Sequence, residues 1–336
     1  MIKVDAGIPM NMNDVKARAE WLEAVGYDGA MTAETSHDPF LPLTIAAEHT
    51  QRVDLMTSIA VAFARNPMLL ANLGHDLNSF SQGRFILGLG SQIRPHIRKR
   101  FSMEWSNPAA RMKEMIQAMH AIWDCWHKGE PLDFRGEFYE HSLMTPVFTP
   151  TDTQYGAPRV FLAAVGPVMT KTAAEVADGL IIHSFSTAKY IKEVTMPMVE
   201  ATLSANGRSR EDFSLSYPAF VVTGETEEAF NKAKKMTQER IAFYGSTPAY
   251  KGVLECHGWN DLQPELNRLS KAGQWEEMGT LIDEDILNAF AIVGEPKDIV
   301  GELKSRYEGV LDRITLHFED LEAETVAGFI KDLKAA

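Results

Sequence analysis

Cysteine is scarce in this 336-residue chain, which contains only Cys125 and Cys256. Two thiols are too few for a disulfide framework or a zinc cluster, and such sparing use is typical of a reducing compartment. The chain also lacks an apolar run near the roughly 18 residues of a membrane span. Its first residues, MIKVDAGIPM, lack the charged and apolar regions of a secretion signal. We therefore expect a cytoplasmic protein that does not enter a membrane.

Positive charge is also in short supply, because 33 Lys and Arg residues stand against 46 Asp and Glu residues and give a net charge of -13. Nucleic acids and anionic lipid surfaces are bound by basic faces, so this balance argues against both as partners. The G-K-[ST], H-E-x-x-H and G-x-S-x-G motifs and a helix-opening G-x-G-x-x-G are absent. Their absence argues against nucleotide hydrolysis, metalloproteolysis and α/β-hydrolase chemistry, and we expect no metal centre.

What the sequence does contain is an alternation of short apolar runs with longer amphipathic stretches, which is typical of strand and helix units on a parallel sheet. We expect eight strands, at residues 2–8, 28–34, 53–61, 84–90, 159–165, 179–185, 213–223 and 313–318. Helix starts are expected at Asn13, Pro67 and Asn107-Pro108, and helix ends near Gly26, Gly179 and Gly309. Eight such units favour one (β/α)8 (TIM) barrel domain over residues 1–336 rather than an open doubly wound sheet.

Two segments interrupt the simple alternation. Residues 129–158 predict a loop with a small hairpin around Gly136, and residues 244–292 predict an inserted helical stretch. Insertions at one end of a barrel form either a lid and pocket wall or a contact between subunits. Both possibilities remain open at this point.

Polar residues at the carboxyl ends of the strands are the candidate site residues, because active sites of such barrels lie there. Glu34 and His37 follow the second strand, and both side-chain types can transfer protons near neutral pH when their surroundings adjust the pKa. The neighbouring Asp38 could equally cap the next helix. His183 and His317 also end strands, where a hydrogen-bonded structural histidine is the favoured interpretation.

Two glycine-containing turns predict neighbouring anion sites. Gly90-Ser91-Gln92 ends the fourth strand and exposes backbone N–H groups. Gly166-Pro167 leads the fifth strand directly into a helix, whose positive end then points at the barrel mouth. Two such sites at one end of a barrel suggest a phosphorylated cofactor.

A basic run follows the first of these turns and contains Arg94, His96, Arg98, Lys99 and Arg100 without an acidic residue. In a chain of net negative charge, such a run is either a local anion site or a solvated helix face or interface patch. The residues alone do not separate these alternatives.

Five blocks carry a family resemblance, in order along the chain: AEWLEAVGYDGAMTAETSHDP, VDLMTSIAVAFARNPMLLAN, FSQGRFILGLGSQ, FYEHSLMTP and VFLAAVGPVMTKTAAEVADGLI. Together they resemble the luciferase-like monooxygenase superfamily, and within it the deazaflavin-dependent (coenzyme F420) oxidoreductases. The resemblance implies a luciferase-like TIM barrel and an F420-dependent enzyme that transfers a hydride between the deazaflavin and a small organic substrate. It also implies a homodimer.

The same resemblance implies roles for individual residues. A non-prolyl cis peptide at Ser58-Ile59 would face the cofactor ring, with Glu34 near the ring edge. The ribityl-phosphate side of the cofactor would be held by Gly90, Ser91, Gln92, Ala163, Ala164, Val165, Gly166 and Pro167. The acidic oligoglutamate tail of F420 would give Arg94, Arg98 and Arg100 a partner.

Two alternatives accompany this hypothesis: an FMN-dependent monooxygenase that uses reduced flavin and O2, and a flavin-binding or deazaflavin-binding protein without turnover. Ile93 stands where the family's sugar-phosphate dehydrogenases have a glutamate, so glucose 6-phosphate is not the expected substrate. Ser91 stands where bacterial luciferase has a phosphate-binding arginine, which weakens the FMN alternative. The aromatics Phe138, Tyr139, Trp259 and Trp275 of the two insertions suggest an apolar or ring-containing substrate.

Overall fold

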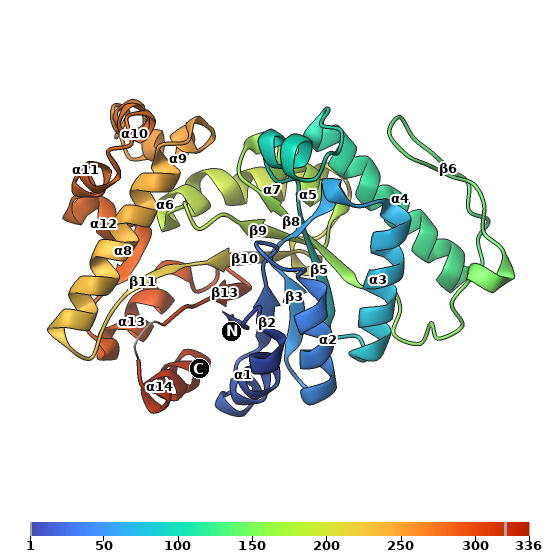
Figure 1. The fold of residues 1–336 in the computed structure, drawn as a ribbon, viewed down its shortest axis with the longest axis horizontal. Helices are drawn as coiled ribbons and strands as arrows, with labels where there is room; N and C mark the ends of the chain where they lie inside the picture. Colours follow the sequence, from blue (N-terminus) through green and yellow to red (C-terminus); the bar gives the residue numbers. More distant parts are fainter. Residues whose placement is uncertain (1, 319–320, 336) are drawn as a thin grey trace.

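A closed parallel barrel forms the centre of the computed structural model, which describes residues 2–318 and 321–335 (Figure 1). Within those residues, eight strands pair in the order β3-β2-β1-β13-β10-β9-β8-β5, and β5 pairs again with β3. They are β1 (Lys3–Gly7), β2 (Gly29–Thr32), β3 (Asp54–Thr57), β5 (Phe85–Gly90), β8 (Arg159–Ala164), β9 (Gly179–Ile182), β10 (Ser214–Pro218) and β13 (Arg313–Thr315). The predicted TIM barrel is thus confirmed.

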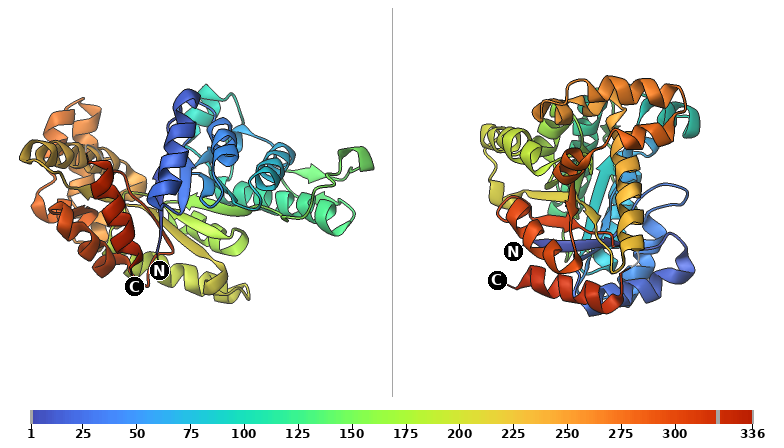
Figure 2. Two further views of the ribbon diagram at one scale, coloured as in Figure 1. Left: turned by 90° about the horizontal axis from the view of Figure 1, so that it is seen from below. Right: turned by 90° about the vertical axis from the view of Figure 1, so that its left-hand side faces the viewer.

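Helices surround the barrel on its outer face. They are α1 (Met12–Val25), α2 (Phe40–His49), α3 (Pro67–Phe80), α4 (Pro108–Lys128), α5 (Pro167–Val176), α6 (Ala188–Tyr190), α7 (Met196–Ala205), α13 (Pro296–Tyr307) and α14 (Ala323–Lys334). Lys334 of the last helix donates to the carbonyl of Gly26 and to Asp28, which places α14 beside α1. Figure 2 shows the two ends of the chain close together in both of its views.

Most of the predicted helix ends agree with the structure. The start at Asn13 is wrong by two residues, because Asn11 is the cap and its side chain accepts the Asn13 N–H at 3.2 Å. Gly26 ends α1 in the left-handed conformation, as expected. Gly179 does not end a helix but begins β9, where a Cβ would lie 2.7 Å from the Phe161 ring.

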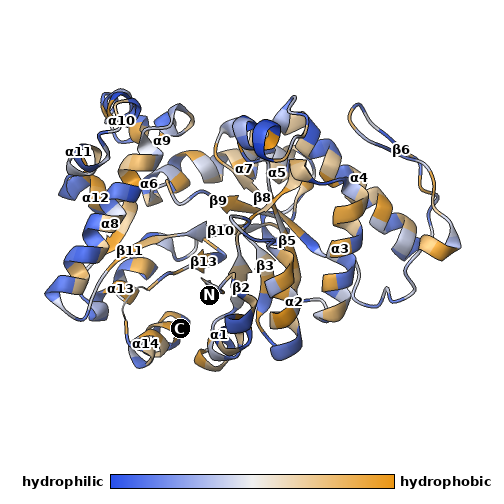
Figure 3. Ribbon diagram, viewed as in Figure 1, coloured by the Kyte–Doolittle hydropathy of each residue, from blue (hydrophilic) through white to orange (hydrophobic). Residues whose placement is uncertain are grey.

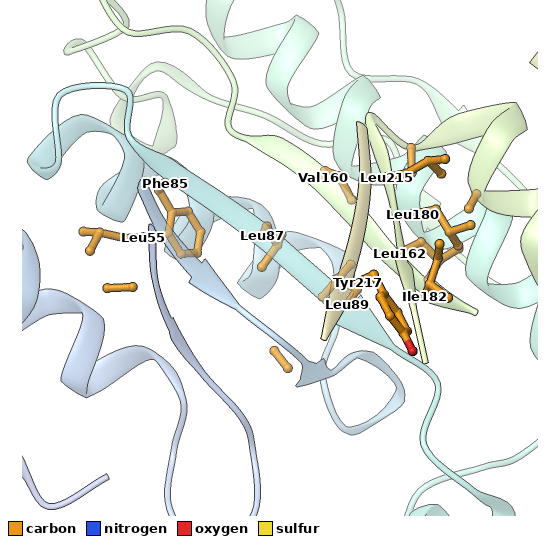
Figure 4. Packing of buried hydrophobic residues seen from close by; sticks show 14 of the residues in the cluster. Leu55, Phe85, Leu87, Leu89, Val160, Leu162, Leu180, Ile182, Leu215 and Tyr217 are labelled. Atoms are coloured by element: carbon orange, nitrogen blue, oxygen red, sulfur yellow. The ribbon is translucent and has the colours of Figure 1, made fainter. Parts of the chain in front are cut away.

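Two apolar layers hold the barrel, because successive residues of a strand face opposite sides. The inner layer is formed by Met31, Met56, Ile86, Phe161 and Ile181. The outer layer packs between the strands and the helices, and Figure 4 shows part of it, from Leu55 on β3 to Tyr217 on β10. Each layer buries large side chains completely, which is the main source of barrel stability.

The amino ends of the strands enclose a buried ion cluster in place of apolar residues. Arg313 on β13 makes two bonds to Asp5 on β1, at 2.9 and 2.6 Å, and one to Asp54 on β3 at 2.6 Å. Lys3 and Arg159 also pair with Asp54. This cluster lies at the end of the barrel opposite the candidate site and ties the four strands β1, β3, β8 and β13 together.

The first insertion is the expected hairpin, formed by β6 (Phe134–Arg135) and β7 (Glu140–His141). Glu114 on α4 anchors it by accepting the N–H groups of Glu137, Phe138 and Tyr139. Gly136 is required beside this carboxylate, since a Cβ there would lie 2.0 Å from it. The hairpin therefore lies over α4.

The second insertion is helical, as predicted, but it begins and ends differently. The run 213–223 breaks after Pro218, and its second half, β11 (Phe220–Val222), leaves the barrel to pair with an unpredicted strand, β12 (Ala291–Val293). Between them lie α8 (Glu227–Gly245), α9 (Lys251–Cys256), α10 (Leu262–Lys271), α11 (Trp275–Thr280) and α12 (Glu284–Phe290). These elements share their own apolar cluster and form a lobe on the side of the barrel away from the hairpin (Figures 1 and 2).

No helix among the described residues is long and apolar enough to cross a membrane.

Candidate functional site

The bulge after β3 lies at the carboxyl end of the barrel. The peptide bond between Ser58 and Ile59 is cis, as the family resemblance implies. The chain then continues as β4 (Ala60–Val61), which pairs with the end of β5. Two hydrogen bonds join the bulge to the second strand: Ser58 N–H donates to the carbonyl of Thr32, and Glu34 N–H donates to the carbonyl of Ile59.

Glu34 is held firmly against this bulge. One carboxylate oxygen accepts the Val61 N–H at 2.7 Å and an Arg65 N–H at 2.6 Å, and the side chain is only 7% exposed. Arg65 also reaches Asp38 at 3.2 Å. Asp38 in turn accepts the N–H of Phe40 and thereby supports the start of α2, as the capping alternative expected. His37 lies exposed between these two carboxylates in the sequence.

The glycines of β5 allow the bulge to approach. The Gly88 backbone exchanges two hydrogen bonds with the Thr57 hydroxyl, and a Cβ at Gly88 would lie 1.7 Å from the Thr57 carbonyl oxygen. A Cβ at Gly90 would lie 2.8 Å from the Ile59 side chain. The structure thus brings Gly90, Ser58, Ile59 and Glu34 together.

Beyond Gly90 the chain turns sharply. Gln92 has a φ of 59°, and its side-chain oxygen accepts the Ile93 N–H, while the Ser91 hydroxyl donates to the Gln92 carbonyl. The basic run follows, with a π-helical turn over His96–Arg100. Arg94 and Arg98 are exposed and have no ion pair within the described part of the chain, whereas Arg100 donates to the carbonyl of Thr35.

The β8–α5 turn forms one wall of a separate cavity of about 140 Å³. Ala164, Val165, Gly166 and Pro167 line it, and Ala163 lies one residue earlier on β8. The opposite wall comes from the end of β9 and from residues 249–253 of the second insertion. The β8–α5 residues thus line a cavity beside the inserted lobe, while Ala163 and Ile59 of the bulge pack against the same inner-layer cluster.

His183 at the end of β9 lines this cavity and bonds to Tyr250 of the insertion. Its Nδ1 accepts the Phe185 N–H at 3.0 Å, and its Nε2 lies 3.2 Å from the Tyr250 hydroxyl. Burial lowers the pKa of His183 to about 4, so its imidazole is neutral at neutral pH. Burial also raises the pKa of Tyr250 to about 12. The structure agrees with a hydrogen-bonded histidine at position 183 and adds a partner that the sequence did not indicate.

A second cavity, of about 200 Å³, lies where β10 and β13 end. Its polar lining includes Ser184, Thr223, Arg240, Tyr244 and His317. The two cavities lie on either side of the strand end at residues 183–184, since His183 lines one and Ser184 the other. Residues of the inserted lobe line both cavities.

The aromatics proposed as a substrate wall lie elsewhere. Trp259 stacks on His257 with ring centroids 4.4 Å apart, and Trp275 lies 53% exposed against Phe243. Phe138 and Tyr139 pack on the guanidinium of Arg111. The aromatics that line the two cavities are instead Phe185, Tyr190, Phe220, Tyr244, Tyr250 and Phe318.

No group of three or more His, Cys, Asp and Glu side chains within residues 2–318 and 321–335 is arranged to hold a metal ion.

These features define a (β/α)8-barrel protein whose candidate site lies at the carboxyl ends of its strands. The model of the luciferase-like monooxygenase family matches residues 3–313, and the chain belongs to that family. Membership of this family supports an oxidoreductase or monooxygenase activity.

The chain is also similar to individual known proteins. A Mycobacterium tuberculosis protein named only as uncharacterized is 51% identical over 99% of this chain and 98% of its own length. The 5,10-methylenetetrahydromethanopterin reductase of Archaeoglobus fulgidus is 26% identical over 77% of this chain and 74% of its own length. Among solved structures, the coenzyme F420 dependent tetrahydromethanopterin reductase of Methanopyrus kandleri has a TM-score of 0.77 at 20% identity, covering 98% of this chain and 96% of its own.

Proposed function

We propose that this protein is an F420-dependent oxidoreductase that transfers a hydride between the deazaflavin and a small organic substrate. The observation that carries the proposal is the pair of sites at one barrel mouth, the bulge held by Glu34 and the cavity at the start of α5. The relationship to a reductase of the same family supports it. Glucose 6-phosphate is not the proposed substrate, because Ile93 stands where the sugar-phosphate dehydrogenases of the family have a glutamate.

The residues present fit a phosphorylated cofactor. Gly166 is the N-cap of α5, and no side chain accepts a hydrogen bond from the first N–H groups of that helix. The space beside Gly166 is open, since a Cβ there would meet no atom within 4 Å. Space and free N–H groups at a helix start favour a phosphoryl group. Ala163, Ala164, Val165 and Pro167 would form this turn around it, with Ser91, Gln92 and Gly90 on the neighbouring strand end. When bound, the cofactor would supply the hydride chemistry.

Glu34 and His37 have different surroundings and, in our proposal, different roles. The carboxylate of Glu34 is committed to Val61 and Arg65, so it fixes the bulge where Ser58 and Ile59 would face the cofactor ring. His37 is exposed on the same loop and is free to exchange a proton with the substrate.

We expect His37→Ala to lower kcat with an identified substrate by about 100-fold, the low end of what general acid–base catalysis contributes. Its effect on cofactor affinity should be small, because no hydrogen bond or ion pair joins His37 to the bulge among the described residues. Glu34→Gln should instead weaken cofactor affinity by loosening the bulge. Steady-state kinetics and a binding titration for each variant make the comparison. Full turnover and unchanged affinity in both variants would refute the assignment.

The basic run offers a site for the acidic tail of F420, since Arg94 and Arg98 project into solvent beside the β5 turn. Arg94→Glu combined with Arg98→Glu should weaken binding of long-tailed F420 by about tenfold at low salt, and of short-tailed F420 less. Lys171→Glu combined with Lys331→Glu, at exposed positions on α5 and α14, is the charge-matched control. If tail length had no influence on the loss, the basic run would be an ordinary solvated or interface patch.

We also propose a homodimer formed through the outer faces of α2 and α3. Leu41, Leu69 and Phe80 are 55%, 63% and 53% exposed on these helices and border a shared surface depression. Figure 3 shows strongly hydrophobic stretches on both helices. Exposed apolar patches of this kind mark interaction surfaces.

Leu69→Asp should therefore shift the protein from dimer to monomer in light scattering, while Leu143→Asp, at a 78% exposed position of the first insertion, should not. A monomeric wild-type protein would contradict this proposal.

The FMN-dependent monooxygenase remains the second candidate, because the family takes its name from that activity. A phosphoryl site of neutral donors suits either cofactor. Binding without turnover is the third possibility, and the kinetic experiment above distinguishes it.

A further inference from the structure

The cavity at the start of α5 is lined by two largely buried residues whose hydroxyls have no protein partner. Ser186 and Thr195 are 4% and 8% exposed, and both line the cavity. Neither side-chain hydroxyl makes a hydrogen bond to any residue that the structure describes. Two unpartnered hydroxyls that face one cavity offer hydrogen-bond donors to a polar ligand.

Tyr250 supplies a third hydroxyl, and His183 determines which way its proton points. The Nδ1 of His183 accepts the Phe185 N–H, so the neutral ring carries its proton on Nε2. That Nε2–H donates to the Tyr250 oxygen. The Tyr250 O–H is then free to donate a hydrogen bond to another group. It has no acceptor within residues 2–318 and 321–335.

The chemistry of the whole lining favours an anion held by neutral donors. The opposite wall is the uncapped start of the ten-residue helix α5, with its positive dipole end. The lining includes no Asp, Glu, Lys or Arg side chain. A carboxylate in the lining would repel an anion, and none is present.

We propose that Tyr250, oriented by His183, donates a hydrogen bond to the phosphoryl group of the bound cofactor, with Ser186 and Thr195 as further donors. This inference rests on the proposed function for the presence of a phosphorylated cofactor. It adds that the inserted lobe, and not the barrel alone, recognises the phosphoryl group. His183 acts as a positioning residue, because it works through Tyr250.

The test compares ligands that differ in the phosphoryl group. Affinities are measured for F420 and for the same deazaflavin with its ribityl chain but without the phosphate, and likewise for FMN and riboflavin. Tyr250→Phe should weaken binding of the phosphorylated ligand by about 10- to 100-fold and leave the phosphate-free ligand unchanged. Thr195→Val should show the same selectivity if Tyr250→Phe does not fold.

Two further variants separate orientation from packing. Tyr244→Phe is the matched control, since Tyr244 packs edge-on against His183 at 4.8 Å but lines only the other cavity, and it should leave both affinities unchanged. His183→Phe should mimic Tyr250→Phe, and the double variant should lose no more than either single one.

Equal losses for phosphorylated and phosphate-free ligands, or no loss, would overturn the inference. If the wild-type protein binds FMN and not F420, the proposed function fails, while the FMN and riboflavin pair still tests the inference. If it binds neither phosphorylated cofactor, both fail.

Discussion

Replacing Arg313 by methionine should lower the free energy of unfolding by about 3–5 kcal/mol, the usual cost of removing one partner of a buried ion pair. Arg313 is 2% exposed and bonds Asp5, which is fully buried. Without the guanidinium, the Asp5 carboxylate would have no cation in direct contact among the described residues. Denaturant unfolding of the purified protein measures the change.

The neighbouring carboxylate makes the prediction more specific. Burial raises the pKa of Asp54, but Arg313, Arg159 and Lys3 together hold it below its usual range. Asp54 therefore retains two cations in the Arg313→Met variant, and the loss should come mainly from Asp5. Adding Asp5→Asn to Arg313→Met should recover part of the stability.

Arg268→Met is the matched control, because Arg268 pairs with Glu265 on an exposed helix face. Such surface pairs contribute less than about 1 kcal/mol. A loss below that value for Arg313→Met would show that the buried cluster does not hold the barrel strands as we describe.

Gly88→Ala should destabilise the protein by about 3 kcal/mol or prevent folding. The new Cβ would lie 1.7 Å from the Thr57 carbonyl oxygen, which is backbone within the barrel and cannot move without breaking the pairing of β3 with β5. Overpacking of this kind typically costs 1–3 kcal/mol, and more where the backbone must shift. Thermal unfolding without cofactor measures the effect.

Gly166→Ala is the control for the loss of a glycine. Gly166 has φ of -94° and ψ of 164°, which alanine adopts readily, and open space surrounds its Cβ position. We expect its stability in the absence of cofactor to be unchanged within about 0.5 kcal/mol. If Gly88→Ala were as stable as Gly166→Ala, the backbone of Gly88 could not lie as close to the Thr57 carbonyl as we describe.

The sequence predicted the barrel because its signals are local. Eight apolar runs of the right length and the cap at Gly26 need no knowledge of the rest of the chain. The break after Pro218 was missed because Phe220, Val221 and Val222 continue the same apolar pattern. The strand at residues 291–293 was missed because it is three residues long and pairs only with this displaced segment.

The candidate site could be predicted only in part, because only some of its residues are neighbours in the sequence. Turns such as Gly90-Ser91-Gln92 and Gly166-Pro167 are contiguous in sequence and were found. The ion pair of Arg65 with Glu34 spans 31 positions, and the contact of Tyr250 with His183 spans 67. Such pairs are made by the fold, and a single sequence gives no signal for them. The single-domain organisation and the cytoplasmic location stay predictions.

The measurement that tests the central claim most directly is a titration of the cofactor-free protein with F420 and with FMN under identical conditions. Our account predicts tight binding of F420 and negligible binding of FMN. Tight binding of FMN together with no binding of F420 would contradict it and would favour the flavin-dependent monooxygenase.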